Sequence, residues 1–167
     1  IVNHTNNNFS HINATGATTI IGWNCRDAGA STRTVANNIF DDWSGGTGNI
    51  TVLSLGINGT DKAVYGNTIS NITSSATTIC ISSPAGNDNI YNNTVHGIVV
   101  NGTKNATGIN ISAATTKNVY GNKIYDMQAN ASGGSVYGIS VTGSTAAAIT
   151  TNIYNNVIGE LKAPSAN

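Results

Sequence analysis

Carboxylates are the first side chains to consider, because enzymes that cleave polysaccharides use clustered acids, a basic group and often Ca²⁺. The seven acids are Asp27, Asp41, Asp42, Asp61, Asp88, Asp126 and Glu160. Only Asp41 and Asp42 are adjacent, and neighbours in a strand point to opposite faces unless a bend intervenes. Asp126 and Glu160 share one position of two consecutive repeats, described below, so stacking of the repeats would pair them around a cation. The simpler interpretation, which we favour for every acid, is a solvated carboxylate, and we predict no metal site and no cofactor.

Histidine and arginine supply the other groups for catalysis or anion binding. The histidines are His4, His11 and His96, which fall at three different repeat positions. We expect no catalytic role for them, and we expect His4 to cap the end of an apolar stack. Arg26 and Arg33 flank a loop that contains Asp27, which would suit an anion, although a salt bridge within the loop is the simpler interpretation. We predict that the chain is not an enzyme and has no catalytic residues.

Four tyrosines at one repeat position point towards a ligand more specifically than any charged group. They are Tyr65, Tyr91, Tyr120 and Tyr154. The preceding position is apolar and faces inward, so alternation places the rings in one exterior file. Such rings present flat apolar faces to sugar rings, and Asn89, Asn118 and Asn152 would lie beside them. The alternative is that the rings only stabilise the sheet, by about 0.2–1 kcal/mol per pair.

The elements that position these side chains follow from an internal repeat, which has to be sought before anything else. A nine-residue phrase occurs six times, as HTNNNFSHI, VANNIFDDW, VYGNTISNI, IYNNTVHGI, VYGNKIYDM and IYNNVIGEL. The copies start at His4, Val35, Val64, Ile90, Val119 and Ile153, and consecutive starts are 31, 29, 26, 29 and 34 residues apart. The period is therefore loose, but the phrase itself is constant.

Stacking the six copies gives columns with distinct chemistry. The first, sixth and ninth columns are apolar almost without exception and predict a core. The fourth is Asn in every copy: Asn7, Asn38, Asn67, Asn93, Asn122 and Asn156. The third column is Asn or Gly in every copy. Both types tolerate a positive φ, so the third and fourth columns predict a tight bend between two short strands.

Composition and alternation predict an all-β chain. There are 20 Ile and 11 Val against 3 Leu, and β-branched side chains favour strands. A second apolar element follows each phrase, as in Leu53-Ser54-Leu55, Ile79-Cys80-Ile81 and Ile109-Asn110-Ile111, with the middle residue expected to face outward. A weaker first copy is Ile21-Gly22-Trp23. An antiparallel sandwich is the alternative, but it would have no reason to repeat Asn at one position six times.

Units this small bury their apolar faces only by stacking on one another. We therefore predict a right-handed parallel β-helix of about six coils, each of 26–34 residues, with a hydrogen-bonded Asn ladder. Residues 1–167 would form one such segment of a longer repetitive protein. Cys25 and Cys80 lie about two rungs apart in this register, near 9.6 Å, so we predict that they form no disulfide.

Charge and hydropathy exclude several classes of function. Lys plus Arg and Asp plus Glu number 7 each, so the formal charge is zero, which argues against binding to nucleic acid. No apolar run approaches the length of a membrane-spanning helix. Asn, Thr, Gly and Ser together number 82 of the 167 residues, yet the many β-branched residues argue against disorder.

The phrases VYGNTI, IYNNTV, VYGNKI and IYNNVI resemble parallel β-helix repeats of the pectate-lyase-like superfamily. More narrowly, VYGNKIYDMQANASGGSVYGISV and IYNNVIGELKAP resemble repeats of very large secreted Bacteroidota proteins. This resemblance implies cargo of the type IX secretion system and a cell-surface adhesin. It is specific for the fold and weak for function, because the same repeat serves lyases, hydrolases, tailspikes and adhesins.

We therefore expect a non-enzymatic structural or adhesive shaft segment of a secreted, cell-surface protein, with weak glycan binding. Its expected partners are flanking β-helix coils of the same polypeptide and surface glycans. The alternative is a fragment of a β-helix polysaccharide lyase or glycoside hydrolase, which should gather two carboxylates and a Lys or Arg in one groove. A third class is a phage-type fibre, which should trimerise through an exposed apolar file.

Overall fold

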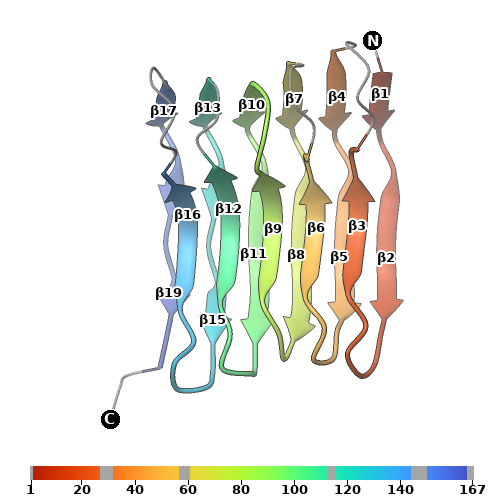
Figure 1. Ribbon diagram of the computed structural model, residues 1–167, viewed down its shortest axis with the longest axis vertical. Coiled ribbons are helices and arrows are strands. Elements are labelled where there is room, and N and C mark those ends of the chain that lie inside the picture. The colour runs from red at the N-terminus through yellow and green to blue at the C-terminus, as the bar shows by residue number, and fades with distance from the viewer. Residues whose placement is uncertain (1, 27–31, 57–60, 113–115, 144–149, 165–167) are drawn as a thin grey trace.

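The computed structural model describes residues 2–26, 32–56, 61–112, 116–143 and 150–164. All regular elements in these ranges are β-strands, and the strands form three parallel sheets (Figure 1). The described chain accordingly contains no helix of the length and apolar character that crossing a bilayer requires. The protein is thus an all-β parallel solenoid, as the repeat predicts.

The first sheet holds the start of each phrase. Its strands are β1 (Val2–Thr5), β4 (Arg33–Ala36), β7 (Lys62–Tyr65), β10 (Asp88–Tyr91), β13 (Lys117–Tyr120) and β17 (Thr151–Tyr154), and they neighbour one another in this order. The register aligns the phrases as predicted, with Val35 opposite Val64 and Val64 opposite Ile90.

The second and third sheets complete each turn. The second sheet contains β2 (Asn8–Asn13), β5 (Ile39–Ser44), β8 (Thr68–Ser74), β11 (Thr94–Val100), then β14 (Lys123–Ile124) with β15 (Met127–Ala129), and β18 (Val157–Ile158) with β19 (Leu161–Lys162). The third contains β3 (Ile20–Asn24), β6 (Ile50–Ser54), β9 (Thr78–Ser83), β12 (Ala106–Ser112) and β16 (Val136–Thr142). Because the third sheet has five strands, the described residues form fewer complete turns than the six coils expected from the phrase.

The apolar columns form the core that the sequence predicts. Val64, Ile69 and Ile72, which represent the first, sixth and ninth columns, are completely buried. The same columns are partly open in the last rung, where 43% of Ile153 and 44% of Ile158 are exposed. The difference arises because each rung is covered by its neighbours, and the described chain places no rung over the last one.

The fourth column forms the predicted Asn ladder. The Nδ2 group of each Asn donates to the Oδ1 atom of the next Asn at 2.9–3.0 Å, through Asn7, Asn38, Asn67, Asn93, Asn122 and Asn156. The same Oδ1 atom accepts the backbone N–H of the preceding Asn, as in Asn38 N–H to Asn67 Oδ1 at 3.0 Å. Nδ2 also donates to a backbone carbonyl of the preceding rung, as from Asn67 to Val35 O at 2.9 Å. Buried amides are thereby satisfied on every side.

The chain turns at two columns whose residues have a left-handed backbone conformation. We expected a single bend formed by the third and fourth columns. The third column has a positive φ in every copy, at Asn6, Asn37, Gly66, Asn92, Gly121 and Asn155, whereas the fourth column does not. The eighth column has a positive φ as well, at His11, Asp42, Asn71, Gly97, Asp126 and Glu160. Our placement of the fourth column in the left-handed region is wrong, and the second bend was missed because its residue types are mixed.

The third sheet corrects the register of one apolar element. Ile81, not Ile79, pairs with Leu53 and Ile109, so the copy of Leu53-Ser54-Leu55 in β9 is Ile81-Ser82-Ser83. Cys80 is completely buried, although we expected it to face outward. Likewise Trp23 pairs with Leu53, which shifts the first copy two residues beyond Ile21. The variable gap between the phrase and this element explains both errors.

Gly97 allows a test of the second bend. Its φ is +65°, and a Cβ atom would lie 2.9 Å from Asn71 Oδ1 and 3.1 Å from the Asn71 backbone N. We expect Gly97→Ala to lower the free energy of unfolding by about 1–2 kcal/mol, measured by urea denaturation with Trp43 fluorescence. Gly143→Ala is the control, because a Cβ there has no neighbour within 4 Å. Equal stability of the two variants would contradict the steric role of the second bend.

Candidate functional site

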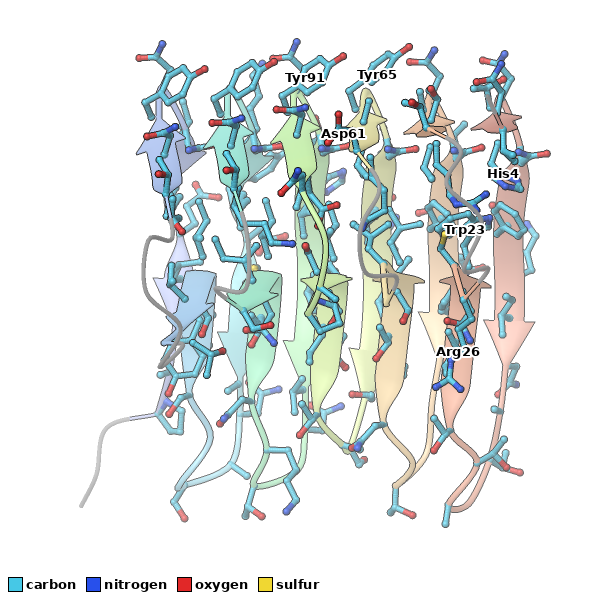
Figure 2. All side chains as sticks on the ribbon, turned by 45° about the horizontal axis from the view of Figure 1, so that its top comes forward. His4, Trp23, Arg26, Asp61, Tyr65 and Tyr91 are labelled. Atoms are coloured by element: carbon cyan, nitrogen blue, oxygen red, sulfur yellow. The ribbon has the colours of Figure 1, made fainter. Side chains whose placement is uncertain are left out.

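The four tyrosines form a continuous stack on the outside of the first sheet. Ring centroids lie 4.8 Å apart between Tyr65 and Tyr91, 4.9 Å between Tyr91 and Tyr120, and 5.0 Å between Tyr120 and Tyr154. The interplanar angles are 15°, 1° and 2°, so the rings are almost parallel. Figure 2 shows Tyr65 and Tyr91 side by side at the edge of the solenoid. The geometric part of the prediction is confirmed, and ligand binding by this tyrosine file stays a prediction.

Strand alternation positions the rings. In β7 and β10 the inward residues Val64 and Ile90 are completely buried, whereas Tyr65 and Tyr91 are partly exposed. Burial, followed by the neighbouring Tyr120 and then Tyr65, raises the pKa of Tyr91. The Tyr91 hydroxyl therefore stays protonated at neutral pH and is available as a hydrogen-bond donor.

An amide file lies beside the tyrosine file, two residues before the tyrosine in β10, β13 and β17. Asn118 Nδ2 donates to Asn89 Oδ1 at 2.8 Å, and Asn152 Nδ2 donates to Asn118 Oδ1 at 2.8 Å. These are the three residues expected next to the rings. Because each amide is oriented by the next one, the file presents polar groups in a fixed arrangement rather than as independent side chains.

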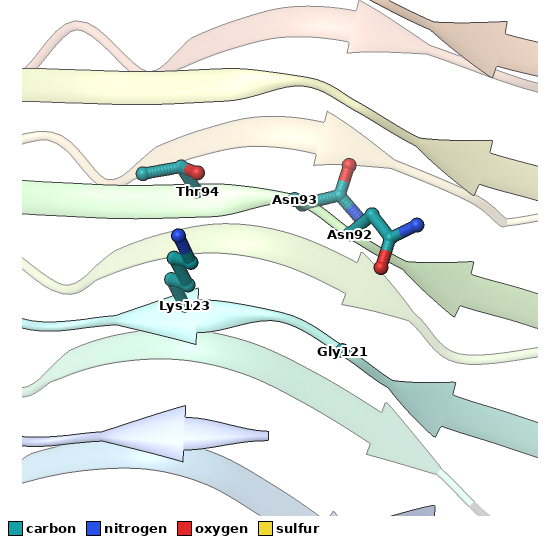
Figure 3. A pocket seen from close by; sticks show the side chains of 5 residues that line it. All are labelled: Asn92, Asn93, Thr94, Gly121 and Lys123. Atoms are coloured by element: carbon teal, nitrogen blue, oxygen red, sulfur yellow. The ribbon is translucent and has the colours of Figure 1, made fainter. Parts of the chain in front are cut away.

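A recess of about 290 Å³ opens on the other side of the tyrosine file, at the first bend. Its lining consists of Asn92, Asn93, Thr94, Gly121 and Lys123 (Figure 3). Asn92 and Gly121 directly follow Tyr91 and Tyr120 in the chain, so the recess adjoins the central rings. The sequence analysis did not identify this recess; its signal was the alternation of Asn with Gly in the third column.

Gly121 makes room at this bend for the side chain of Asn92. Its φ is +64°, and a Cβ atom at this position would collide with Asn92 Oδ1. Gly66 repeats this arrangement against Asn37 two rungs earlier. The residue two positions after each glycine differs. It is Lys123 after Gly121 and Thr68 after Gly66. The cation is therefore specific to the recess at Gly121.

A buried ionic cluster lies on the inner side of the same sheet. Lys62 Nζ is 2.9 Å from Asp88 Oδ1, and Lys117 Nζ is 2.5 Å from Asp88 Oδ2, with all three side chains at most 1% exposed. Lys117 Nζ also donates to Ser83 Oγ at 2.6 Å, and both lysines donate to Ala85 O. Burial lowers the pKa of Lys117, against the raising effect of Asp88.

This cluster corrects two expectations. Asp88 is not a solvated acid, and Arg33 is not a surface group of a loop but is only 2% exposed, at the cluster's position in β4. Asp27, which lies between Arg26 and Arg33 in the sequence, is outside the described residues. Sequence reasoning missed the cluster because it treated charged residues as exposed, although Lys62 and Asp88 have the same strand parity as Val64 and Ile90.

Four of the remaining acids, Asp41, Asp42, Asp126 and Glu160, lie along the second sheet, and Asp61 directly precedes β7 of the first sheet. Asp41 Oδ1 accepts hydrogen bonds from Ser70 Oγ at 2.6 Å and from Asn71 Nδ2 at 2.8 Å, and the bond from Ser70 is the main cause of a lowered pKa. Asp42 Oδ2 lies 2.6 Å from His11 Nδ1 in an exposed pair. Within the described ranges no group of three or more His, Cys, Asp or Glu side chains is arranged to hold a metal ion.

The other sequence candidates take structural positions. His4 packs edge-on against Trp23 at 4.9 Å, in the first rung, where it was expected to cap the stack (Figure 2). His96 stacks on Tyr125 at 5.0 Å outside the second sheet. Cys25 and Cys80 are not joined in a disulfide, as predicted, and burial raises the pKa of the Cys80 thiol.

Comparisons of the chain with protein-family models, with curated proteins and with solved structures give no significant match. The function is therefore inferred from the residues and their geometry. The feature with the clearest chemistry is the exposed surface formed by the tyrosine file, the amide file and the recess at Gly121.

Proposed function

We propose that this chain is a non-enzymatic shaft segment of a longer, secreted cell-surface protein, and that the tyrosine file binds surface glycans weakly. The observation that carries the proposal is the parallel stack of four exterior rings at 4.8–5.0 Å. The coil is proposed to be right-handed, because parallel crossovers almost always are. Export by a type IX system and an adhesin-like role follow from the sequence resemblance and are part of the proposal.

The shaft role is supported by how the molecule is held together. Three parallel sheets and the Asn ladder repeat the same strand pairing and ladder bonds in every inner rung, so rungs can be added without a change of design. The last rung leaves 43% of Ile153 and 44% of Ile158, both in inward-facing columns, exposed. Apolar faces and unpaired strand edges of this kind are normally covered in intact proteins. We propose flanking coils of the same polypeptide as that cover.

Glycan binding is supported by the pairing of flat apolar faces with oriented amides. A sugar ring needs an apolar surface for its C–H face and hydrogen-bonding groups for its hydroxyls. The tyrosine file supplies the first along the outer edges of its stacked rings and at the exposed ring of Tyr154, and Asn89, Asn118 and Asn152 supply the second. A flat exterior strip buries little of its ligand, so one segment should bind weakly, and repeated segments would add avidity.

The proposal is tested by removing the central rings. We expect the double variant Tyr91→Ala, Tyr120→Ala to lose about tenfold or more of the glycan affinity of the wild type, measured first on a glycan array and then by calorimetry. Tyr91→Phe with Tyr120→Phe should keep most of the affinity if ring faces, rather than hydroxyls, make the main contact.

A matched control removes an exterior ring from another face. Tyr137, in β16 of the third sheet, is 44% exposed, so Tyr137→Ala should leave binding unchanged. The unfolding midpoint of each variant separates lost binding from lost fold. Equal binding by the wild type and the double variant, or no glycan binding by the wild type, would leave the tyrosine file as a purely structural stack and overturn the proposal.

A further inference from the structure

The buried ionic cluster of the first sheet holds an amine in direct contact with a carboxyl group. Asp88 in β10 pairs with Lys117 in β13 across adjacent strands, and neither side chain has any exposed surface. Lys117 Nζ lies 2.5 Å from Asp88 Oδ2. Because a carbon–oxygen bond adds only about 1.2 Å, Nζ lies within about 3.7 Å of the carboxyl carbon, Asp88 Cγ. This separation is close to the range of about 3–3.5 Å from which positioned groups react.

Burial favours the neutral forms of this pair over the charged ones. Taking two charges out of water costs free energy, which their attraction repays only where the geometry is excellent. Burial lowers the pKa of Lys117, against the raising effect of Asp88, so the neutral and nucleophilic amine is easier to reach than in water. A buried site also keeps bulk water away from an activated carboxyl group. Condensation of the two groups into a neutral amide would remove both buried charges.

Two further groups of the cluster contact the reacting atoms. Lys62 Nζ lies 2.9 Å from Asp88 Oδ1, so its ammonium charge faces an oxygen on which negative charge would develop. Ser83 Oγ donates to Asp88 Oδ2 and accepts a hydrogen bond from Lys117 Nζ at 2.6 Å, so one hydroxyl bridges the amine and the carboxyl group. Ala85 O accepts from Lys117 Nζ at 3.2 Å and would accept the N–H of an amide formed there.

We propose that Lys117 and Asp88 condense after folding into an intramolecular isopeptide bond, which joins the fourth and fifth rungs of the first sheet covalently. A proton passes from the Lys117 ammonium to Asp88 Oδ2, directly or through Ser83 Oγ, and the neutral Nζ attacks Cγ. The C–N bond forms, a second proton passes from the nitrogen to Oδ2, and the Cγ–Oδ2 bond breaks with release of one water molecule. Oδ1 becomes the amide oxygen. One positive and one negative charge disappear together, so the net charge is unchanged and no co-reactant is needed.

The register limits the bond to one pair of rungs. The position of Asp88 in the first sheet is occupied in the other rungs by Val2, Arg33, Lys62, Lys117 and Thr151. Asp88 is therefore the one carboxyl group at this position, and its neighbours on either side are Lys62 and Lys117. We assign the bond to Lys117, because its Nζ is the closer of the two and shares Ser83 with the carboxyl group.

Intact-mass spectrometry of the folded wild type tests the bond directly. We expect a mass lower than that of the sequence by one water molecule. Trypsin digestion of the denatured protein should then fail to cut after Lys117 and should release residues 63–104 joined to residues 105–123. The full sequence mass in the wild type would overturn the proposal.

The digest also distinguishes two other ways of losing water. A bond from Asp88 to Lys62 would give a closed peptide of residues 34–104 and would overturn the assignment to Lys117. Loss of water within residues 63–104, with normal cutting after Lys62 and Lys117, would indicate a cyclic imide and would overturn the proposal.

Variants separate the reacting groups from their neighbours. Lys117→Met removes the nucleophile and should have the full mass of its sequence, whereas Lys104→Gln, at an exposed position, should lack one water like the wild type. Ser83→Ala and Lys62→Met keep both reacting groups. Each should form the bond at least about tenfold more slowly, as followed by intact mass at increasing times after a short pulse of expression. Formation at the wild-type rate in both would overturn the roles of Ser83 and Lys62, even if Lys117→Met does not fold.

The bond would stabilise the shaft independently of any ligand. It closes a loop between residues 29 positions apart, which restricts the unfolded chain as a disulfide does. The fraction of wild-type protein that lacks one water should therefore unfold at a higher urea concentration than the fraction with the full mass, as read by pulse proteolysis and mass spectrometry. Equal midpoints would overturn this stabilising role. The double variant Tyr91→Ala, Tyr120→Ala should lack one water like the wild type, so failure of glycan binding and failure of the bond are separate results.

Discussion

Replacement of Asp88 by alanine is expected to lower the free energy of unfolding by about 3–5 kcal/mol, the usual effect of removing one partner of a buried ion pair. Asp88 is shared by Lys62 and Lys117, and the three side chains are at most 1% exposed. The variant would leave two ammonium groups facing each other across an apolar interior. Urea denaturation followed by Trp43 fluorescence measures the change, because Trp43 is buried in the core.

Two further variants distinguish a charge effect from a packing effect. Asp61→Ala removes an exposed acid that accepts one bond from Asn87, and it should change stability little. The triple variant Lys62→Met, Asp88→Leu, Lys117→Met replaces the three ionic side chains by apolar ones. It should be more stable than Asp88→Ala alone, because buried ion pairs are often replaceable as a unit but not singly. A triple variant less stable than Asp88→Ala would show that packing, rather than unpaired charge, causes the loss.

The parts of the fold that were predictable are those in which each rung repeats the same residue type. The apolar columns represented by Val64, Ile69 and Ile72 repeat with constant spacing inside a nine-residue phrase, so the register of two sheets followed directly. The Asn column was predictable for the same reason, because a side chain that bonds its own copy needs an identical residue in the next rung. The tyrosine file followed from strand alternation next to an inward column.

The parts of the fold that could not be predicted include positions that adopt the same backbone conformation in every repeat but hold different residue types. The eighth column holds His11, Asp42, Asn71, Gly97, Asp126 and Glu160, which share a positive φ but neither charge nor size. The third sheet follows a gap of variable length, so Cys80 was placed on the wrong face. The inner position that holds Lys62, Asp88 and Lys117 violates the usual preference of charged residues for the surface.

The recess at Gly121 combines both kinds of information. The third column predicts a bend at every rung and shows which rungs carry a side chain there, but it does not indicate which exterior side chains gather beside the bend. Gly121 makes room for the Asn92 side chain at the bend, and Lys123, two residues later, supplies a charge that the equivalent Thr68 and Thr94 lack.

Asn67→Ala is expected to lower the free energy of unfolding by at least about 3 kcal/mol, because several buried groups lose a partner at once. Asn67 Oδ1 accepts from the backbone N–H and from Nδ2 of Asn38, and its own Nδ2 donates to Val35 O and to Asn93 Oδ1. The matched control is Asn7→Ala in the first rung, where Asn7 is exposed and only its contact with Asn38 Oδ1 belongs to the ladder. An equal loss of stability in both variants would mean that the side-chain ladder adds nothing to the backbone pairing.

Asn67→Asp sharpens this test, because it keeps the acceptor and the shape but removes the donor. Val35 O and Asn93 Oδ1 would then face a buried carboxylate, and burial together with these acceptors should raise its folded-state pKa above the unfolded value of about 3.9. The folded variant would bind the proton more tightly than the unfolded chain. Its stability should therefore be greatest below the unfolded pKa and should fall as the pH rises towards the raised folded-state pKa. Urea denaturation of this variant and of the wild type between acidic and neutral pH measures the difference in their free energies of unfolding. A difference that does not depend on pH would contradict the interpretation that Asn67 is a buried hydrogen-bond donor in the ladder.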